Sequence, residues 1–171
     1  TYLTTKFPIY DQGVMTGIGA IGTDITERKR AEVARQESDN RFQTVVDSSP
    51  AAITLKDRNG VFLLVNQTYA KWANSTSTKI IGRKVHDLFS KEQADIIEAL
   101  DQNIMASGED HARETVITYG DGQTRNILTQ KRPIYSADGN VASISTIITD
   151  ITEQKQAEIA LQESESRFLS I

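Results

Sequence analysis

A charged segment occurs twice in this chain, and its two copies are a whole domain apart. Residues 24–42 and 150–168 are identical at thirteen of nineteen positions, with an offset of 126 residues. Both copies begin with Asp-Ile-Thr-Glu and end with Arg-Phe. Solenoid repeats are only about 20 to 50 residues long, so a period of this length indicates a tandem array of complete domains.

The duplication predicts where one unit ends and the next begins. The likeness extends upstream, because residues 8–10 and 133–135 both read Pro-Ile-Tyr once one residue is inserted into the second loop. We therefore expect one complete domain, large enough to bury its own core, with parts of its neighbours. The predicted segments are the C-terminal strands of a preceding unit at 1–27, a helical linker at 28–41, the complete domain at 42–153 and a helical linker toward the next unit at 154–171.

Composition limits the classes of function. The chain is 25% charged and 38% hydrophobic with a net charge of -4, which fits a globular module and argues against nucleic-acid binding. It has no cysteine, so disulfides and a cysteine-linked chromophore are excluded. No apolar run approaches the roughly 18 residues of a membrane span. We therefore expect no membrane contact by this fragment and a cytoplasmic location, with any membrane anchor elsewhere in a parent protein.

Periodicity and turn signals predict an α+β fold for the complete domain. Two strands joined by an Asn-Gly turn at 59–60 come first, followed by helices, and then by three strands over 113–119, 125–135 and 141–151. Connections of hairpin length within each group of strands favour a five-stranded antiparallel sheet. The helices are expected to pack on one face of that sheet.

The longest predicted helix has clear boundaries and two faces. Ser90 opens a capping box and Gly108 supplies the stop. An apolar stripe is expected to face the core, whereas Asp95, Glu98 and Asp101 are expected to face solvent. Acid-base catalysis by these three carboxylates is the alternative, and their helical spacing favours the solvated face.

Residues 6–26 read as a β-hairpin with no sheet of its own to join. An isolated hairpin cannot bury an apolar face, so it is either frayed or paired with another copy of the chain by a swap or an edge addition. Residues 26–40 are rich in helix formers, and a separate helical turn is expected at 42–46. A dimeric parallel helix and a solvated connecting helix both fit this segment.

Several short motifs recur along this order of elements: Gly60, the strand leading into Asn66, Ile80-Ile81-Gly82, His86-Asp87-Leu88-Phe89, Gly120-Asp121-Gly122, Asp138-Gly139 and Asp150-Ile151-Thr152-Glu153. Together with the order of elements, these motifs resemble the PAS family with its trailing PAC segment. The resemblance covers essentially all of residues 42–153, and it implies a sensory or relay module of a bacterial signal transduction protein. The parent would be a sensor histidine kinase of a two-component system or phosphorelay, or a diguanylate cyclase or phosphodiesterase. Its catalytic site would then lie outside these residues.

The resemblance also implies how such a module works. A cavity between the sheet and the helices can hold a small molecule, and its filling would alter how the terminal helix leaves the last strand. The side chains expected at this signal junction, in both copies, are Asp24, Thr26, Asp150, Ile151 and Thr152. A plain helix N-cap is the alternative role for Thr152.

Thirteen residues are candidates for the wall of that cavity, although they describe a filled core equally well. Arg125 could meet the carboxylate of an anionic ligand, but a surface ion pair is favoured for it. The candidates are Ile53, Leu55, Val65, Asn66, Tyr69, Trp72, Ile81, Ile97, Leu100, Ile117, Arg125, Ile127 and Ile147.

The sequence does not identify a cofactor, and we expect neither haem nor flavin. His86 could be an axial haem ligand, as a histidine is in some relatives, but a structural or partly exposed role is favoured. His111 lies in an acidic loop and is expected to be solvated, and two histidines so placed predict no metal site. A non-covalent flavin held by Trp72 and Asn66 is the alternative to a core position for Trp72.

Two classes of function follow from these observations. The favoured class is a sensor that binds an unknown small molecule, or responds by dimer rearrangement, and passes the signal through its C-terminal helix. The alternative is a ligand-free domain that serves only for dimerisation and spacing. In both cases we expect a homodimer, formed through residues 1–41 and the linker helices.

Overall fold

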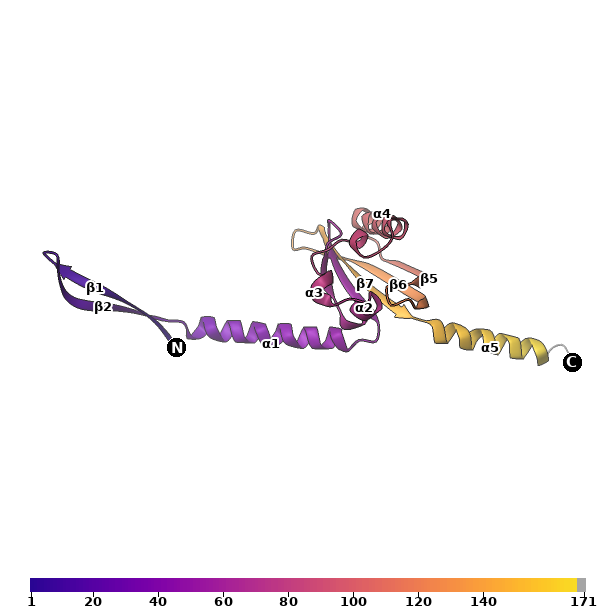
Figure 1. Cartoon of the computed structure of the whole chain (residues 1–171), viewed down its shortest axis with the longest axis horizontal. Coiled ribbons are helices and arrows are strands. Elements are labelled where there is room, and N and C mark those ends of the chain that lie inside the picture. The colour runs from indigo at the N-terminus through magenta and orange to yellow at the C-terminus, as the bar shows by residue number, and fades with distance from the viewer. Residues whose placement is uncertain (169–171) are drawn as a thin grey trace. The chain divides into compact units, whose positions relative to one another are not determined.

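The chain forms two compact units. The computed structural model describes residues 1–168, and Figure 1 shows the order of their helices and strands. One unit comprises Thr1–Thr44, and the other begins at Val45. The second unit contains the sheet and helices that the sequence predicts for the complete domain.

The first unit begins with a long hairpin. Strands β1 (Tyr2–Asp11) and β2 (Val14–Asp24) pair antiparallel around a turn in which Gln12 and Gly13 both have positive φ. The hairpin is longer than predicted, because its first strand starts four residues before the expected position. Glycine adopts positive φ without steric cost, which explains the sharp reversal at this point.

Helix α1 (Thr26–Ser48) follows the hairpin as one continuous helix. The sequence predicted a separate helical turn at 42–46, and that boundary is wrong. No Gly or Pro interrupts the segment, so the helix continues until the Ser-Pro step at 49–50. Val46, near its end, is buried.

The first hairpin repeats the backbone pairing of the last one, formed by β6 (Thr124–Tyr135) and β7 (Val141–Asp150). Each hairpin carries a register shift at its Ile-Tyr step, at 9–10 in one and at 134–135 in the other. The duplication seen in the sequence therefore extends to strand register.

A five-stranded antiparallel sheet forms the centre of the second unit. Its other strands are β3 (Ala52–Asp57), β4 (Phe62–Val65) and β5 (His111–Thr118), and the order across the sheet is β4-β3-β7-β6-β5. Gly60, with φ of 75°, lies in the tight turn between β3 and β4. The predicted α+β fold with a five-stranded antiparallel sheet is confirmed.

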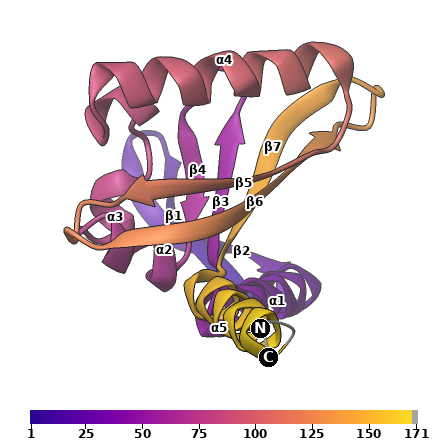
Figure 2. The ribbon, with the colours of Figure 1, turned by 90° about the vertical axis from the view of Figure 1, so that its right-hand side faces the viewer.

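Four helical segments accompany the sheet, and Figure 2 shows α4 lying across it. They are α2 (Gln67–Trp72), α3 (Ser77–Ile80), the 3-10 turn η1 (Val85–Asp87) and α4 (Lys91–Ser107). Ser90 caps α4, and Gly108 ends it with φ of 70°, as predicted. Helix α5 (Thr152–Phe168) follows β7, so residues 169–171 of the predicted linker lie outside the described residues. Within residues 1–168, no helix is long and apolar enough to cross a bilayer.

The core lies between the sheet and the short helices. The rings of Phe62 and Tyr69 pack with centroids 5.7 Å apart, and those of Trp72 and Tyr119 with centroids 5.1 Å apart. All four side chains are buried. Burial of apolar surface contributes about 25 cal/mol per Å², so these rings are a major part of what holds α2 against the sheet.

Asn66 joins three segments of the second unit. Its side chain is fully buried, and its amide oxygen accepts hydrogen bonds from the backbone N–H groups of Ile53 (2.9 Å) and Tyr69 (3.0 Å). Its amide nitrogen donates to the carbonyl oxygens of Val46 (3.1 Å) and Ala51 (2.8 Å). One side chain thus caps α2, as predicted, and also binds the end of α1 and the start of β3.

Replacing Asn66 by Ala should destabilise the chain by about 3 kcal/mol, because buried donors and acceptors lose their partners. Asn103→Ala is the matched control, since Asn103 is exposed on α4 and its loss should change stability by at most about 0.5 kcal/mol. Urea unfolding followed by circular dichroism measures both free energies. Equal stability of the two variants would contradict the joining role of Asn66.

Candidate functional site

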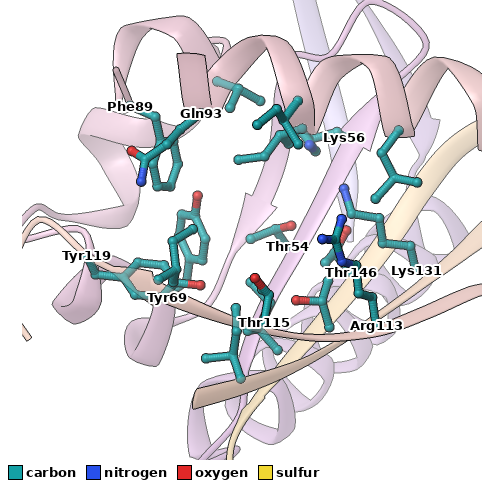
Figure 3. Close-up of a pocket in the computed structure, with 18 of the residues that line it drawn as sticks. Thr54, Lys56, Tyr69, Phe89, Gln93, Arg113, Thr115, Tyr119, Lys131 and Thr146 are labelled. Carbon is teal, nitrogen blue, oxygen red and sulfur yellow. The ribbon is translucent and has the colours of Figure 1, made fainter. Parts of the chain in front are cut away.

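A cavity of about 310 Å³ lies between α4 and the sheet. Its two ends differ in chemistry, as Figure 3 shows. Cationic and hydroxyl side chains gather at one end, and aromatic side chains gather at the other. A cavity of this volume is within the range that small molecules occupy.

Strand pairing places four polar side chains in one row across the cavity. His111 lies opposite Lys131, Lys131 lies opposite Thr146, and Thr146 lies opposite Thr54. Directly opposite residues on antiparallel strands share one face of the sheet, with Cβ atoms about 4.5 to 5.5 Å apart. These four residues, one from each of β5, β6, β7 and β3, are called the polar row below.

Asp101 of α4 binds Lys131 of the polar row and Lys56, which lies outside the row on β3. Lys56 and Lys131 each donate a hydrogen bond to one of its carboxylate oxygens, and all three residues are buried. The expectation that Asp101 faces solvent is therefore wrong. Asp101 follows Ile97 by four residues and precedes Ile104 by three, so the helical period places it on the buried stripe.

The lysine pair carries an excess positive charge. Two ammonium groups share one carboxylate, which leaves one charge uncompensated in the buried cluster. Burial, and after it repulsion by Lys56, lowers the pKa of Lys131 below its ordinary value of 10.5. Arg113 adds a third cation to the wall, and no Asp or Glu of the described residues lines the cavity.

Two buried polar atoms at the cavity have no hydrogen-bond partner within residues 1–168. They are His111 Nε2 and Thr146 Oγ1, which flank Lys131 in the polar row. The expectation that His111 is solvated is wrong, because β5 starts at this residue and its side chain lines the cavity. An unpaired buried polar atom costs about 1–3 kcal/mol, so a ligand that bonded here would offset that cost.

The other end of the cavity is aromatic. Burial raises the pKa of Tyr69 and of Tyr119 above the ordinary value of 10, so both phenols keep their protons. Phe89 meets the Tyr119 ring edge-on at a centroid distance of 6.3 Å. This end suits an apolar or aromatic part of a ligand.

Five of the thirteen predicted wall residues line this cavity. They are Tyr69, Ile97, Leu100, Ile117 and Ile127. The structure thus brings them together from α2, α4, β5 and β6. Their contact with a ligand stays a prediction.

Three predicted wall residues lie on the opposite face of the sheet. Ile53, Leu55 and Ile147 point away from the cavity, because Thr54 and Lys56 occupy the inward positions of β3. Side chains alternate with a period of two, so an error of one residue moves a whole strand pattern to the other face. The expected inward face of β3 and β7 is therefore wrong.

The remaining five candidates do not line the cavity. Val65, Asn66 and Trp72 are buried in the surrounding core, and the core position favoured for Trp72 is the one observed. Ile81 is 46% exposed after α3 and is no part of a cavity wall. Arg125 also lies outside the lining, in the ion pair described below.

Sequence reasoning missed the polar residues at the cavity. Lys56, Lys131 and Thr146, which line it, were not considered; His111, which also lines it, and Asp101, which binds the two lysines, were assigned to solvent. Helical spacing from the apolar stripe was a usable signal for Asp101. No local signal marked the strand residues, because their inward direction depends on register across the whole sheet.

The end of β7 and the start of α5 form a hydrogen-bonded junction. The backbone N–H of Thr152 donates to Asp150 Oδ1 at 2.9 Å, and Thr152 Oγ1 accepts from the backbone N–H of Asn126 at 2.9 Å. The N–H of Ile151, which is buried, donates to the carbonyl oxygen of Asn126 at 2.8 Å. Thr152 therefore holds α5 to a neighbouring strand as well as starting the helix.

The first copy of the motif forms the same bonds. The backbone N–H of Thr26 donates to Asp24 Oδ1 at 2.9 Å, and Thr26 Oγ1 accepts from the amine of Thr1 at 2.6 Å. The N–H of Ile25 donates to the carbonyl oxygen of Thr1 at 2.9 Å. The predicted junction residues thus occupy equivalent places in both copies, and their role in signalling stays a prediction.

Arg125 lies between the aromatic end of the cavity and this junction. Its guanidinium carbon is 4.7 Å from the Trp72 ring centroid and 5.9 Å from that of Tyr119. It donates to both carboxylate oxygens of Asp121, at 3.0 and 2.6 Å, and its Nε lies 3.4 Å from Asp150 Oδ2. The ion pair favoured from the sequence is present, but the Arg125 side chain is only 14% exposed.

His86 lies between two carboxylates of α4. Its Nε2 is 2.8 Å from Asp95 Oδ1, and its Nδ1 is 3.4 Å from Glu98 Oε2. The side chain is 38% exposed, which agrees with the partly exposed histidine favoured from the sequence. Asp95 is exposed as expected, whereas Glu98 is half-buried.

The sequence model of a protein family described as "PAS fold" matches residues 46–156. This part of the chain contains the sheet, the cavity and the junction. The chain belongs to the PAS family. The PAS domain of BvgS from Bordetella pertussis has a TM-score of 0.60 at 19% identity, over 77% of this chain and 98% of that one. VqmA of Vibrio cholerae, solved as a dimer without its target DNA, has a TM-score of 0.61 at 20% identity, over 67% of this chain and 52% of that one. At these identities the likeness shows the fold alone.

Relatives by sequence include sensor kinases. The methanogenesis regulatory histidine kinase FilI of Methanothrix harundinacea is 30% identical over 124 residues, which are 72% of this chain and 14% of FilI. The two-component sensor PprA of Pseudomonas aeruginosa is 22% identical over 147 residues, 86% of this chain and 16% of PprA. The chain thus spans 14% to 16% of these relatives, and it is a PAS sensory domain similar to those of histidine kinases.

The lysine pair predicts opposite effects for two substitutions. Asp101→Asn leaves two buried ammonium groups without a carboxylate and should destabilise the chain by about 3–5 kcal/mol. Lys131→Met leaves a balanced pair of Lys56 and Asp101, so stability should be unchanged or higher by about 1 kcal/mol. Thermal and urea unfolding of both variants measure this. A larger loss for Lys131→Met than for Asp101→Asn would contradict the charge count.

Proposed function

We propose that this PAS domain is a sensory module that binds a small molecule in the cavity and passes the signal through α5 to an output domain. One set of contacts supports this proposal: Tyr119 lines the cavity, Arg125 lies against Tyr119 and Asp150, and Asp150 caps α5. A ligand that favours one arrangement of the Tyr119 ring would shift Arg125 and so alter the junction, provided that its affinity differs between the two arrangements.

The names of the sequence relatives support a histidine kinase as the output domain of the parent protein. FilI and PprA are named as a histidine kinase and a two-component sensor. We therefore propose that the parent protein is a cytoplasmic or membrane-anchored sensor histidine kinase of a two-component system. A phosphorelay, and a diguanylate cyclase or phosphodiesterase output, are the alternatives that the family resemblance leaves open.

A ligand-free spacer is the competing proposal. A domain that serves only to dimerise and to separate its neighbours gains nothing from an interior cavity. The cavity of about 310 Å³, and the two unpartnered atoms at its wall, both lower stability and so argue for an occupant.

The domain boundaries remain part of the proposal. Residues 1–27 are proposed as the last strands of another PAS unit, since their hairpin repeats both the register and the cap of β6–β7. Residues 28–41 and 154–171 are proposed as linker helices, with 42–153 as the complete domain. A homodimer through residues 1–41 and these helices would cover apolar hairpin side chains that are exposed in the single chain.

Denaturing extraction of the purified chain, followed by mass spectrometry, should recover a small molecule in stoichiometric amount. Its removal should change amide hydrogen exchange in the first turns of α5 by several-fold, because the junction bonds rearrange. In Arg125→Met the molecule should still bind but α5 should no longer respond. Arg132→Met is the matched control, since Arg132 lies on the same strand and pairs with Asp110 at the surface. A chain that holds no molecule, with unaltered exchange, would favour the spacer.

Light scattering tests the homodimer. The whole chain should have the mass of two copies, and residues 45–171, which form a compact unit, should have the mass of one. An unchanged subunit number after removal of residues 1–44 would show that this segment does not mediate assembly.

A further inference from the structure

We propose that the cavity binds the carboxylate of a monoanionic organic acid at the polar row. The inference rests on the sensory function proposed above and adds the chemical class of the ligand. Its basis is a buried excess of positive charge next to two polar atoms that lack partners.

Charge balance calls for one negative charge in the ligand. Lys56 and Lys131 are more than nine-tenths buried, and both line the cavity, whereas Asp101 reaches them from α4 and is no part of that lining. An ammonium group has three N–H donors, and Asp101 accepts one hydrogen bond from each lysine. The cavity side of the cluster is therefore cationic, and one carboxylate there balances it.

The polar row supplies donors on both sides of such a carboxylate. Neighbouring strands are about 4.8 Å apart, so a group above Lys131 on β6 lies between His111 on β5 and Thr146 on β7. The Thr146 hydroxyl donates to one carboxylate oxygen, and His111 donates to the other from Nε2, in the neutral tautomer that has its N–H there. Both atoms would then gain the partners that they lack in the unliganded chain.

Arg113 would attract an anion from solvent to the same end of the cavity. It lies two residues beyond His111 on β5, and its exposed side chain points toward Lys131 in Figure 3. An exposed guanidinium attracts a carboxylate from solvent before the buried lysines bind it.

The aromatic end of the cavity determines which apolar groups of the acid fit. Tyr69, Phe89 and Tyr119 form an aromatic wall, and Ile97 and Leu100 of α4 add aliphatic surface. The volume of about 310 Å³ limits the ligand to a small molecule. Small aromatic and short aliphatic monocarboxylic acids therefore fit, and their neutral amides lack the charge that the lysines require.

Matched pairs of acid and amide test the inference on the whole chain, freed of any bound molecule by refolding. The probes are benzoate and benzamide, phenylacetate and phenylacetamide, and hexanoate and hexanamide, measured by ligand-observed NMR and calorimetry up to millimolar concentrations. Acids should bind about 10- to 100-fold more tightly than their amides, which is the effect of one charge-assisted hydrogen bond. Lys131→Met should abolish this preference, and Thr146→Val should weaken acid binding about tenfold.

Thr149→Val is the matched control, because Thr149 lies on the same strand and belongs to the opposite face of the sheet. It should leave acid binding unchanged, and thermal melts confirm that each variant folds. Equal affinity for acid and amide, an acid preference that survives Lys131→Met, or no binding of any probe would overturn the inference. If amides bind as well as acids, the sensory proposal stands without the anion; if extraction also yields no molecule and no probe binds, both fail.

Discussion

The interaction on which the cavity depends is the carboxylate of Asp101 shared by Lys56 and Lys131. Apolar contacts alone would let α4 slide over the sheet, because the hydrophobic effect is not directional. Charges in a poorly solvated interior are costly to separate, so this cluster fixes α4 at one place above β3 and β6. The cavity lies between α4, held at this place, and the sheet.

The fold could be predicted because its boundaries are set by local chemistry. The turn at Gly60, the cap at Ser90 and the stop at Gly108 act within a few residues, and each appears in the structure where the sequence places it. Asn66 was recognised only as a cap. Its bonds to Val46 and Ala51 depend on chain segments that only the folded structure brings together.

The wall of the cavity was harder to predict, because one strand of the sheet, β3, reverses the usual assignment of faces. In β3 the apolar Ile53 and Leu55 face outward, and the polar Thr54 and Lys56 face inward. A rule that sends apolar side chains to the interior therefore selects the wrong face of the strand. Lys56 is stable at its inward position because Asp101 pairs with it. Asp101 lies on a helix far along the chain, so the residues around Lys56 give no sign of this partner.

The polar row has a consequence for how such modules diversify. Each of four strands contributes one side chain to it, and the backbone hydrogen bonds that hold those strands do not involve that side chain. Exchanging His111, Lys131, Thr146 or Thr54 would therefore rewrite the chemistry of recognition and leave the sheet and the Asp150–Thr152 exit untouched. Under the proposed function, gene duplication followed by changes at these few positions would give an array whose members bind different compounds and pass the signal on through the same junction.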